Sequence, residues 1–182
     1  EALRQFLEMG PDILSITKSY SEEEKKPSPD INMQDALDIL QYCPMITHAA
    51  PYTSIYCRIQ YNGKELWAPS LGITDNFFDL NKLSLKQGRF FSELDGDACY
   101  CVVGHEIAEK LCLAGAKKLI GTAFSLNKKK FTIIGVLEKT EMGGMRPYEI
   151  NHGIMIPFST VKRISNDIMI KDIIARMRSK DE

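Results

Sequence analysis

Residues 121–138 constrain the fold more than any other stretch of the chain. They form two apolar segments that alternate with small or polar residues, joined by a short polar turn at 127–130. This pattern is typical of a β-hairpin, because asparagine tolerates the left-handed backbone of a tight turn and the lysines stay in water. Strict alternation predicts one face made of Ala123, Ser125, Phe131 and Ile133, and another made of Phe124, Leu126, Ile134 and Val136. The segment carries no catalytic group, so we expect it to build a scaffold.

The composition limits the class of protein. The chain has 182 residues, of which 44% are hydrophobic and 26% charged, as expected for one compact domain or two small lobes. Its 23 basic and 24 acidic residues leave a net charge of -1, which gives no basic face for nucleic acid. No run approaches the roughly 20 apolar residues that cross a bilayer. Because the chain begins with Glu1 inside a helical pattern, we expect it to be a segment of a longer protein.

The first third of the chain predicts a β-α-β unit followed by a hairpin. We expect a helix at 1–9, a strand at 12–18, a mobile linker at 20–30 and a helix at 33–42 that Asn32 caps. The apolar face of the second helix is predicted to be Ala36, Leu37, Ile39 and Leu40. Residues 45–61 read as an extended segment interrupted near Pro51, and Asn62-Gly63 predicts a tight turn into a strand at 64–73.

The rest of the chain alternates short strands and short helices. We expect a helical turn at 74–78, an irregular connection at 83–90, a polar turn at 92–97, a strand at 99–103 and a helix at 106–113. After the 121–138 hairpin, the pattern predicts a strand at 153–157, a short helix at 159–164 and a last strand at 173–177. The order predicts an α+β fold with the middle inserted as its own lobe.

The search for chemistry finds no catalytic, cofactor-binding or metal-binding motif. The histidines His48, His105 and His152 lack metal-ligand spacing, and His105 is expected to cap the helix that it begins. The acidic residues Asp75, Asp79, Asp95 and Asp97 fall in turns, where the backbone favours them. We therefore expect a chain that is not an enzyme and needs no cofactor.

Five cysteines are an odd number, so at least one thiol stays unpaired within a monomer. Cys99 and Cys101 lie two apart on one strand, where a disulfide would need distortion. Buried free thiols are the expected state of these cysteines.

The loop at 139–152 is the one candidate for partner contact. It contains residue types that are enriched in interfaces, namely Met142, Met145, Arg146 and Tyr148. The alternative is a surface loop whose methionines fold back onto the core.

Several phrases of the sequence together resemble one family. They are Met9 to Ile16, Gly72 to Phe78, Gly88 to Phe91, Cys101 to Gly104 and Met155 to Phe158. In this order they are similar to the extracytoplasmic domain of MacB and FtsX-like ABC transporter permeases. The likeness extends over almost the whole chain, although each phrase alone is degenerate.

The resemblance implies a β-α-β porter-like lobe with an inserted β-rich sabre-like lobe. Residues 1–60 would begin the porter-like lobe, 61–165 would form the sabre-like lobe, and 166–182 would supply the return strand of a truncated porter-like lobe. It also implies a domain facing the periplasm or outside, held to the inner membrane by flanking helices that this chain lacks. The permease would be a homodimer, with a periplasmic adaptor and an outer-membrane channel as partners. A lipoprotein-release or FtsX-like permease, or a free-standing sensor or enzyme domain, remains the alternative.

Overall fold

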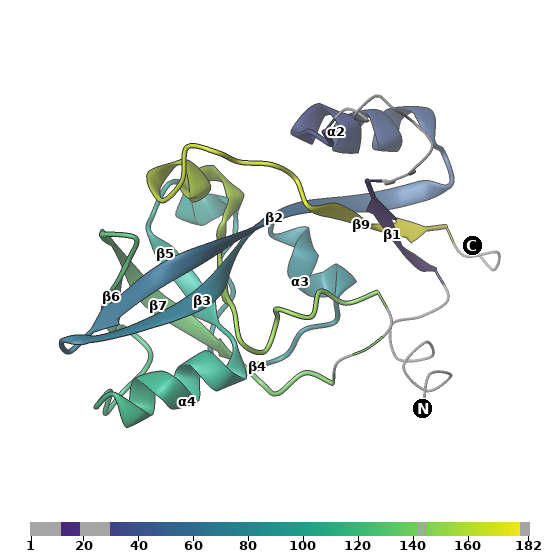
Figure 1. Ribbon diagram of the computed structural model, residues 1–182. Helices are drawn as coiled ribbons and strands as arrows, with labels where there is room; N and C mark the ends of the chain where they lie inside the picture. Colours follow the sequence, from purple (N-terminus) through teal and green to yellow (C-terminus); the bar gives the residue numbers. More distant parts are fainter. Residues whose placement is uncertain (1–11, 19–29, 142, 144, 179–182) are drawn as a thin grey trace.

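The structure is a computed structural model that describes residues 12–18, 30–141, 143 and 145–178 (Figure 1). The helix expected at 1–9 lies outside these residues, as does the linker expected at 20–30 except for Asp30. Helices and strands are mixed along the chain, which confirms the α+β class. The elements are β1 (Ile13–Thr17), α2 (Met33–Tyr42), β2 (Ile46–Tyr61), β3 (Lys64–Ile73), α3 (Asn76–Leu80), β4 (Leu85–Gly88), η1 (Glu93–Asp95), β5 (Tyr100–Val103), α4 (His105–Leu113), β6 (Ala123–Leu126), β7 (Lys129–Leu137), β8 (Ile154–Pro157), η2 (Phe158–Arg163) and β9 (Asp172–Met177).

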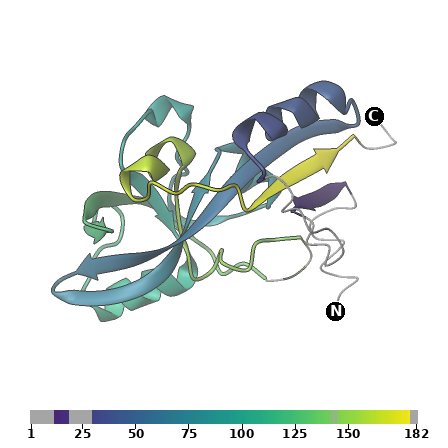
Figure 2. The same cartoon turned by 45° about the horizontal axis from the view of Figure 1, so that its top comes forward.

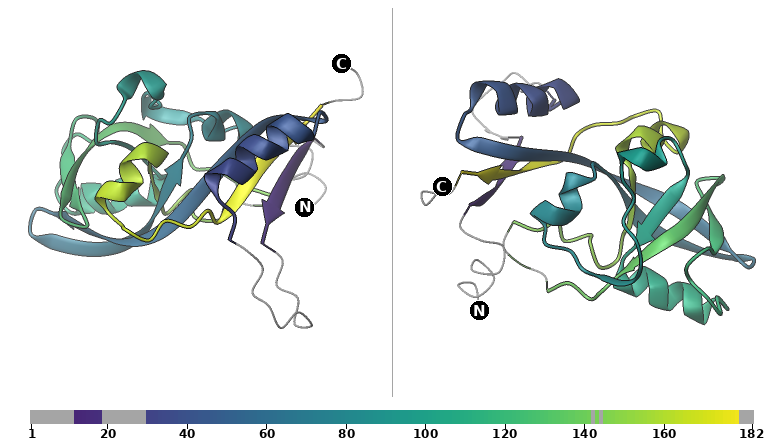
Figure 3. Two further views of the ribbon diagram at one scale, coloured as in Figure 1. Left: turned by 90° about the horizontal axis from the view of Figure 1, so that it is seen from above. Right: turned by 180° about the vertical axis from the view of Figure 1, so that it is seen from behind.

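The described strands join one mixed sheet in the order β1-β9-β2-β3-β8-β5-β7-β4, and β6 pairs with β2 and β7. Both β1 and β2 are antiparallel to β9, which lies between them, so β1 and β2 run in the same direction. The crossover between them contains α2, which lies over these strands (Figure 3). This arrangement is the expected β-α-β unit, with the last strand of the chain inserted at its centre.

Helix α2 begins at the predicted cap. The Asn32 side chain accepts from the N–H groups of Gln34 and Asp35, at 2.8 and 3.2 Å, and Asp35 accepts from the Asn32 N–H in return. The predicted apolar face is only half right. Ala36 is buried, whereas Leu37 and Leu40 are 54% and 38% exposed. Helix α2 packs against only a small part of the sheet. A narrow apolar stripe along the helix is therefore enough to contact the cluster of Ala49, Ile170 and Ile173.

Strand β2 runs without the predicted interruption at Pro51. Its first half pairs with β9 and its second half with β3, so it extends from the α2 end of the molecule to the hairpin tip (Figure 2). Asn76 donates to the Ala49 carbonyl from the side away from β9. Pro51 lies two residues after Ala49, so its backbone groups face the same side of β2. Strand β3 pairs with β2 on that side, but it ends at Ile73, opposite Tyr52. The missing N–H of Pro51 therefore faces a side without a strand, where proline is tolerated.

Both predicted hairpins form. Asn62 and Gly63 have φ values of 48° and 70°, and Asn127 and Lys128 have 45° and 68°. The face assignment across the second turn was wrong, because Phe124 lies directly opposite Phe131 and therefore shares its face. The residues from this hairpin in one core cluster are Phe124, Leu126, Phe131, Ile133 and Val136.

The connection predicted at 83–90 is partly regular, which corrects the sequence interpretation. Residues Leu85–Gly88 form β4, which pairs with the end of β7 through an irregular register. Its short, mostly exposed pattern gave no alternation from which a strand could be predicted. The two parallel pairings of the sheet, β3 with β8 and β5 with β7, belong to its central strands.

The sheet has an apolar cluster on each face. One cluster contains Ile107 and Leu111 of α4, and the other contains Phe77, Phe78 and Leu80 of α3. The short helices thus cover the central strands from both sides (Figure 1). In the described part of the chain, no helix has the length and apolar character needed to span a membrane.

Candidate partner-binding loop

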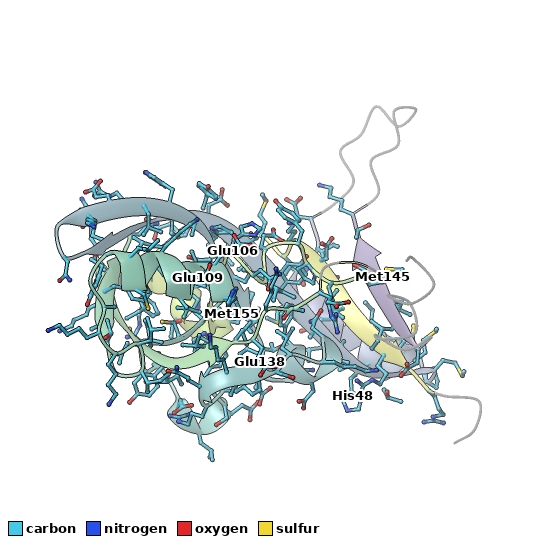
Figure 4. All side chains as sticks on the ribbon, turned by 90° about the horizontal axis from the view of Figure 1, so that it is seen from below. His48, Glu106, Glu109, Glu138, Met145 and Met155 are labelled. Atoms are coloured by element: carbon cyan, nitrogen blue, oxygen red, sulfur yellow. The ribbon has the colours of Figure 1, made fainter. Side chains whose placement is uncertain are left out.

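Residues 139–152 connect β7 to β8 and contain the predicted contact residues. Met142 lies outside the described residues. Met145 is 47% exposed and Tyr148 is 65% exposed, so the loop presents apolar and aromatic surface to solvent. Figure 4 shows Met145 in the half of the molecule that carries β1 and β9, whereas Glu106 and Glu109 of α4 lie in the other half.

Arg146 is directed toward the chain itself. Its Nε donates to the carbonyl of Asn81 at 3.0 Å, and its Nη1 donates to the carbonyl of Glu141 at 3.1 Å. Asn81 is fully buried and ends α3, and its own amide donates to the Phe77 carbonyl at 2.9 Å. Arg146 therefore positions the loop against α3.

A charge pair between a buried carboxylate and a partly exposed lysine fixes the other side of the loop. Glu149 is 2% exposed, and its Oε1 accepts from the Nζ of Lys171, the residue immediately before β9. Its Oε2 has no hydrogen-bond partner among the described residues. The Lys171 nitrogen also lies 4.9 Å from the centre of the Tyr148 ring, a cation–π geometry. The contact with Lys171 thus positions the ring of the exposed Tyr148.

The same region joins β9 to β2. The Lys171 N–H donates to the Tyr52 carbonyl, and the Tyr52 hydroxyl donates to Asp172 Oδ2, both at 2.8 Å. Burial, with a further contribution from Asp172, raises the pKa of Tyr52 far above its usual range, so the hydroxyl keeps its proton. No local sequence pattern predicts this network, because its members belong to three segments distant along the chain.

The base of the loop is closed by Asn151. Its side chain exchanges two hydrogen bonds with the Thr140 backbone, at 2.9 and 2.7 Å. Its carbonyl accepts from the Glu106 N–H at 2.9 Å, which joins the loop to the start of α4. The loop therefore combines a fixed base with an exposed Met145 and Tyr148.

Two of the acidic turn residues, Asp75 and Asp95, accept hydrogen bonds from backbone N–H groups. Asp75 accepts from the Asn76 N–H at 2.8 Å. Asp95 accepts two bonds from the Arg89 guanidinium, at 2.6 and 2.8 Å, and one from the Ser92 N–H at 2.9 Å. Arg89 first, and then the Ser92 N–H, lower the pKa of Asp95 to about 2. Over the described ranges, no three His, Cys, Asp or Glu residues gather as metal ligands.

The histidine cap and the burial of the thiols were predicted incorrectly in part. The N-cap of α4 is Gly104 without a side-chain bond, and His105 Nε2 instead lies 3.3 Å from Glu109 Oε1. All five cysteines are free, but Cys43 and Cys112 are exposed, and only Cys57 and Cys101 are buried. Burial raises the pKa of both buried thiols, so they remain protonated.

Solved structures of other proteins share this fold. The periplasmic region of MacB from Actinobacillus actinomycetemcomitans superposes with a TM-score of 0.74 at 22% identity, covering 98% of this chain and 80% of that one. The extracellular domain of the noncanonic ABC-type transporter YknZ from Gram-positive bacteria gives a TM-score of 0.76 at 18% identity, covering 93% and 86% of the two chains.

The sequence comparison is more specific than the fold. The profile of the MacB-like periplasmic core domain matches residues 1–182, and the chain belongs to this family. The macrolide export ATP-binding/permease protein MacB of Aggregatibacter actinomycetemcomitans is 27% identical over 143 residues, or 78% of this chain. MacB of Neisseria meningitidis serogroup B is 33% identical over 98 residues, 53% of this chain. The chain spans 22% and 15% of these relatives, so it corresponds to one part of them.

Proposed function

We propose that this chain is a non-catalytic extracytoplasmic domain that couples cytoplasmic ATP hydrolysis to export or other work outside the cytoplasm. The observation that carries the proposal is the family match over the whole chain. In the proposed setting, flanking helices hold the domain to the inner membrane of a homodimeric permease. A periplasmic adaptor and an outer-membrane channel are the proposed partners.

The geometry supports a mechanical role. Ile13 of β1 pairs with Arg176 of β9, and the Met177 N–H donates to the Asp12 carbonyl at 2.7 Å. The first and last described strands therefore lie side by side, and a displacement of either flanking segment would act on neighbouring strands. Strand β2 then connects this region to the distant hairpin (Figure 2).

We also propose the two-lobe division, with 1–60 and 166–182 in a porter-like lobe and 61–165 in a sabre-like lobe. The pairing of β2 supports a shared strand, because its first half bonds β9 and its second half bonds β3. The change of partner falls at Tyr52, whose hydroxyl and carbonyl also bond the start of the β9 segment. In this division Tyr52 lies within the porter-like lobe, and the part of β2 that follows it would pass motion to β3 of the sabre-like lobe.

Partner contact is proposed at the exposed part of the loop, Met145 and Tyr148, with Arg146 as the residue that positions it. Methionine adapts to varied surfaces and tyrosine is enriched at interfaces, so both suit a docking surface. In the full-length permease, the double substitution Met145→Asp with Tyr148→Ala should abolish export while leaving expression and basal ATP hydrolysis unchanged.

The matched control is Leu94→Asp, which places the same charge at a residue that is 98% exposed on η1. Export should survive this control. Normal export by the double variant would show that the loop is scaffold only. If neither the double variant nor Leu94→Asp is expressed, Arg146→Lys tests the loop instead. This substitution keeps the positive charge but loses the paired hydrogen-bond geometry of the guanidinium.

A further inference from the structure

Strand β2 has a gap in its hydrogen bonding on the side away from β3. On this side it pairs with β9 up to Tyr52 and with β6 from Ile59. The Tyr52 carbonyl accepts from Lys171 at 2.8 Å and the Arg58 carbonyl accepts from Asn127 at 2.9 Å, so even-numbered positions direct their backbone groups here. Ser54 and Tyr56 lie between these two bonds. Within the described part of the chain, their N–H and C=O groups have no partner.

A groove of about 480 Å³ opens at this gap. Thr53, Ser54 and Ile55 form one wall, and the opposite wall is the segment that leads into β9, including Asp167, Met169 and Ile170. Beside the groove, Tyr56 is 66% exposed and stacks on Trp67 with ring centres 6.3 Å apart. Solvent can therefore reach the unpaired backbone groups, and apolar side chains lie near them.

Another free edge of the sheet is protected, whereas this one is open. Strand β3 pairs with β8 only from Ser70 onward. The remainder of its edge carries Pro69, which has no N–H to offer, and the charged Lys64 and Glu65. The gap in β2 runs from Thr53 to Cys57 and contains no proline or charged residue. Its four unpaired groups match the requirement for binding an added strand.

We infer that the gap in β2 binds an extended segment of a partner protein by β-strand addition. The bound segment would exchange backbone hydrogen bonds with Ser54 and Tyr56 and place alternate side chains on the two faces of the sheet. Asp167 is exposed and its carboxylate has no described partner, whereas Asp30 at the same groove is bonded to Lys18 at 2.7 Å. A basic residue in the segment therefore suits Asp167. The inference rests on the proposed role in partner binding and specifies the chemistry of the partner.

The test uses this chain and a capped pentapeptide that has a central lysine with two valines on each side. Amide exchange at Ser54 and Tyr56 is followed by NMR as the peptide is added. At a free peptide concentration about ten times Kd, both amides should exchange about tenfold more slowly. The same peptide with N-methyl groups on the amides that face β2 is the control, because it keeps the side chains and loses the hydrogen bonds. It should give no protection.

A second measurement uses Ser54→Pro, which removes an N–H that faces the groove and leaves the bonds between β2 and β3 intact. This variant should bind the peptide at least tenfold more weakly. If it fails to fold, the N-methylated peptide still decides the question. Absence of protection at millimolar peptide overturns the inference, as does protection that grows with chain concentration alone, which assigns the edge to a second copy. Neither result affects the export assay, so failure here is distinct from failure of the proposed function.

Discussion

The ammonium group of Lys171 lies 4.9 Å from the centre of the Tyr148 ring while it bonds the buried carboxylate of Glu149. One cation thus fixes an exposed aromatic side chain and neutralises a charge beneath it. Removing one member of such a pair leaves the other charge buried and unpaired.

Lys171→Met should therefore destabilise the fold while keeping much of the packing of the side-chain stem. Removal of one partner of a fully buried pair costs about 3–5 kcal/mol, and the partial exposure of Lys171 lowers the expectation to about 2 kcal/mol. Urea unfolding measures this free energy. Lys162→Met, at an exposed position of η2, is the control and should change stability by less than about 0.5 kcal/mol. Adding Glu149→Gln to Lys171→Met should restore part of the loss, and a double variant less stable than the single one would contradict the assignment.

The pair of Arg89 and Asp95 should make stability depend on pH in the acid range. The pKa of Asp95 falls from 3.8 to about 2 in the folded chain, with the Arg89 bond as the largest cause. A lowered folded pKa means that the carboxylate stabilises the fold above about pH 4, and that this contribution is lost as the pH falls toward 2. The urea midpoint of the wild type should exceed that of Asp95→Asn at pH 6, and the two should converge near pH 2. A constant difference across this range would exclude the linkage.

Local structure was readable from the sequence wherever a residue type forces one backbone conformation. Asn62-Gly63 gave a turn with both φ values positive, and Asn32 gave the helix start, because these effects depend only on adjacent residues. The prediction of which residues share a face was wrong across the turn at Asn127. Alternation applies within one strand, whereas the relation between two strands depends on how they pair. Residues directly opposite each other in paired strands, such as Phe124 and Phe131, share a face of the sheet regardless of how far apart they are in the sequence.

The candidate site was less predictable than the fold. The exposed types Met145 and Tyr148 could be found from composition, but Arg146 bonds carbonyls of its own chain. The supporting residues Glu149 and Lys171 are 22 positions apart and belong to no common motif. Their meeting depends on the crossing of the loop and the β9 segment, which no local pattern encodes.

The Asn62-Gly63 turn offers a direct test of the hairpin. Gly63 has a φ of 70° and no atom within 4 Å of an added Cβ, so the cost of substitution there is conformational. Gly63→Val should lower the free energy of unfolding by about 1 kcal/mol or more, because β-branched residues resist positive φ. Gly63→Asn is the control and should cost less, since asparagine tolerates this region. Equal melting temperatures for the Gly63→Val variant and the wild-type chain would show that the turn contributes nothing to stability.

Gly104 provides the opposite case, in which the cost is steric. Its φ of -66° is available to any residue, but an added Cβ would lie 2.3 Å from the Ile150 carbonyl oxygen and 2.4 Å from that of Asn151. Gly104 also donates to the Gly153 carbonyl at 2.9 Å, so the backbone cannot move away without losing that bond. Gly104→Ala should therefore cost about 2 kcal/mol or more, at the upper end of the range for overpacking. It should also speed amide exchange at Glu106, whose N–H bonds Asn151. Unchanged exchange at Glu106 together with wild-type stability would mean that the 150–151 segment yields freely, and that the base of the loop is not fixed by α4.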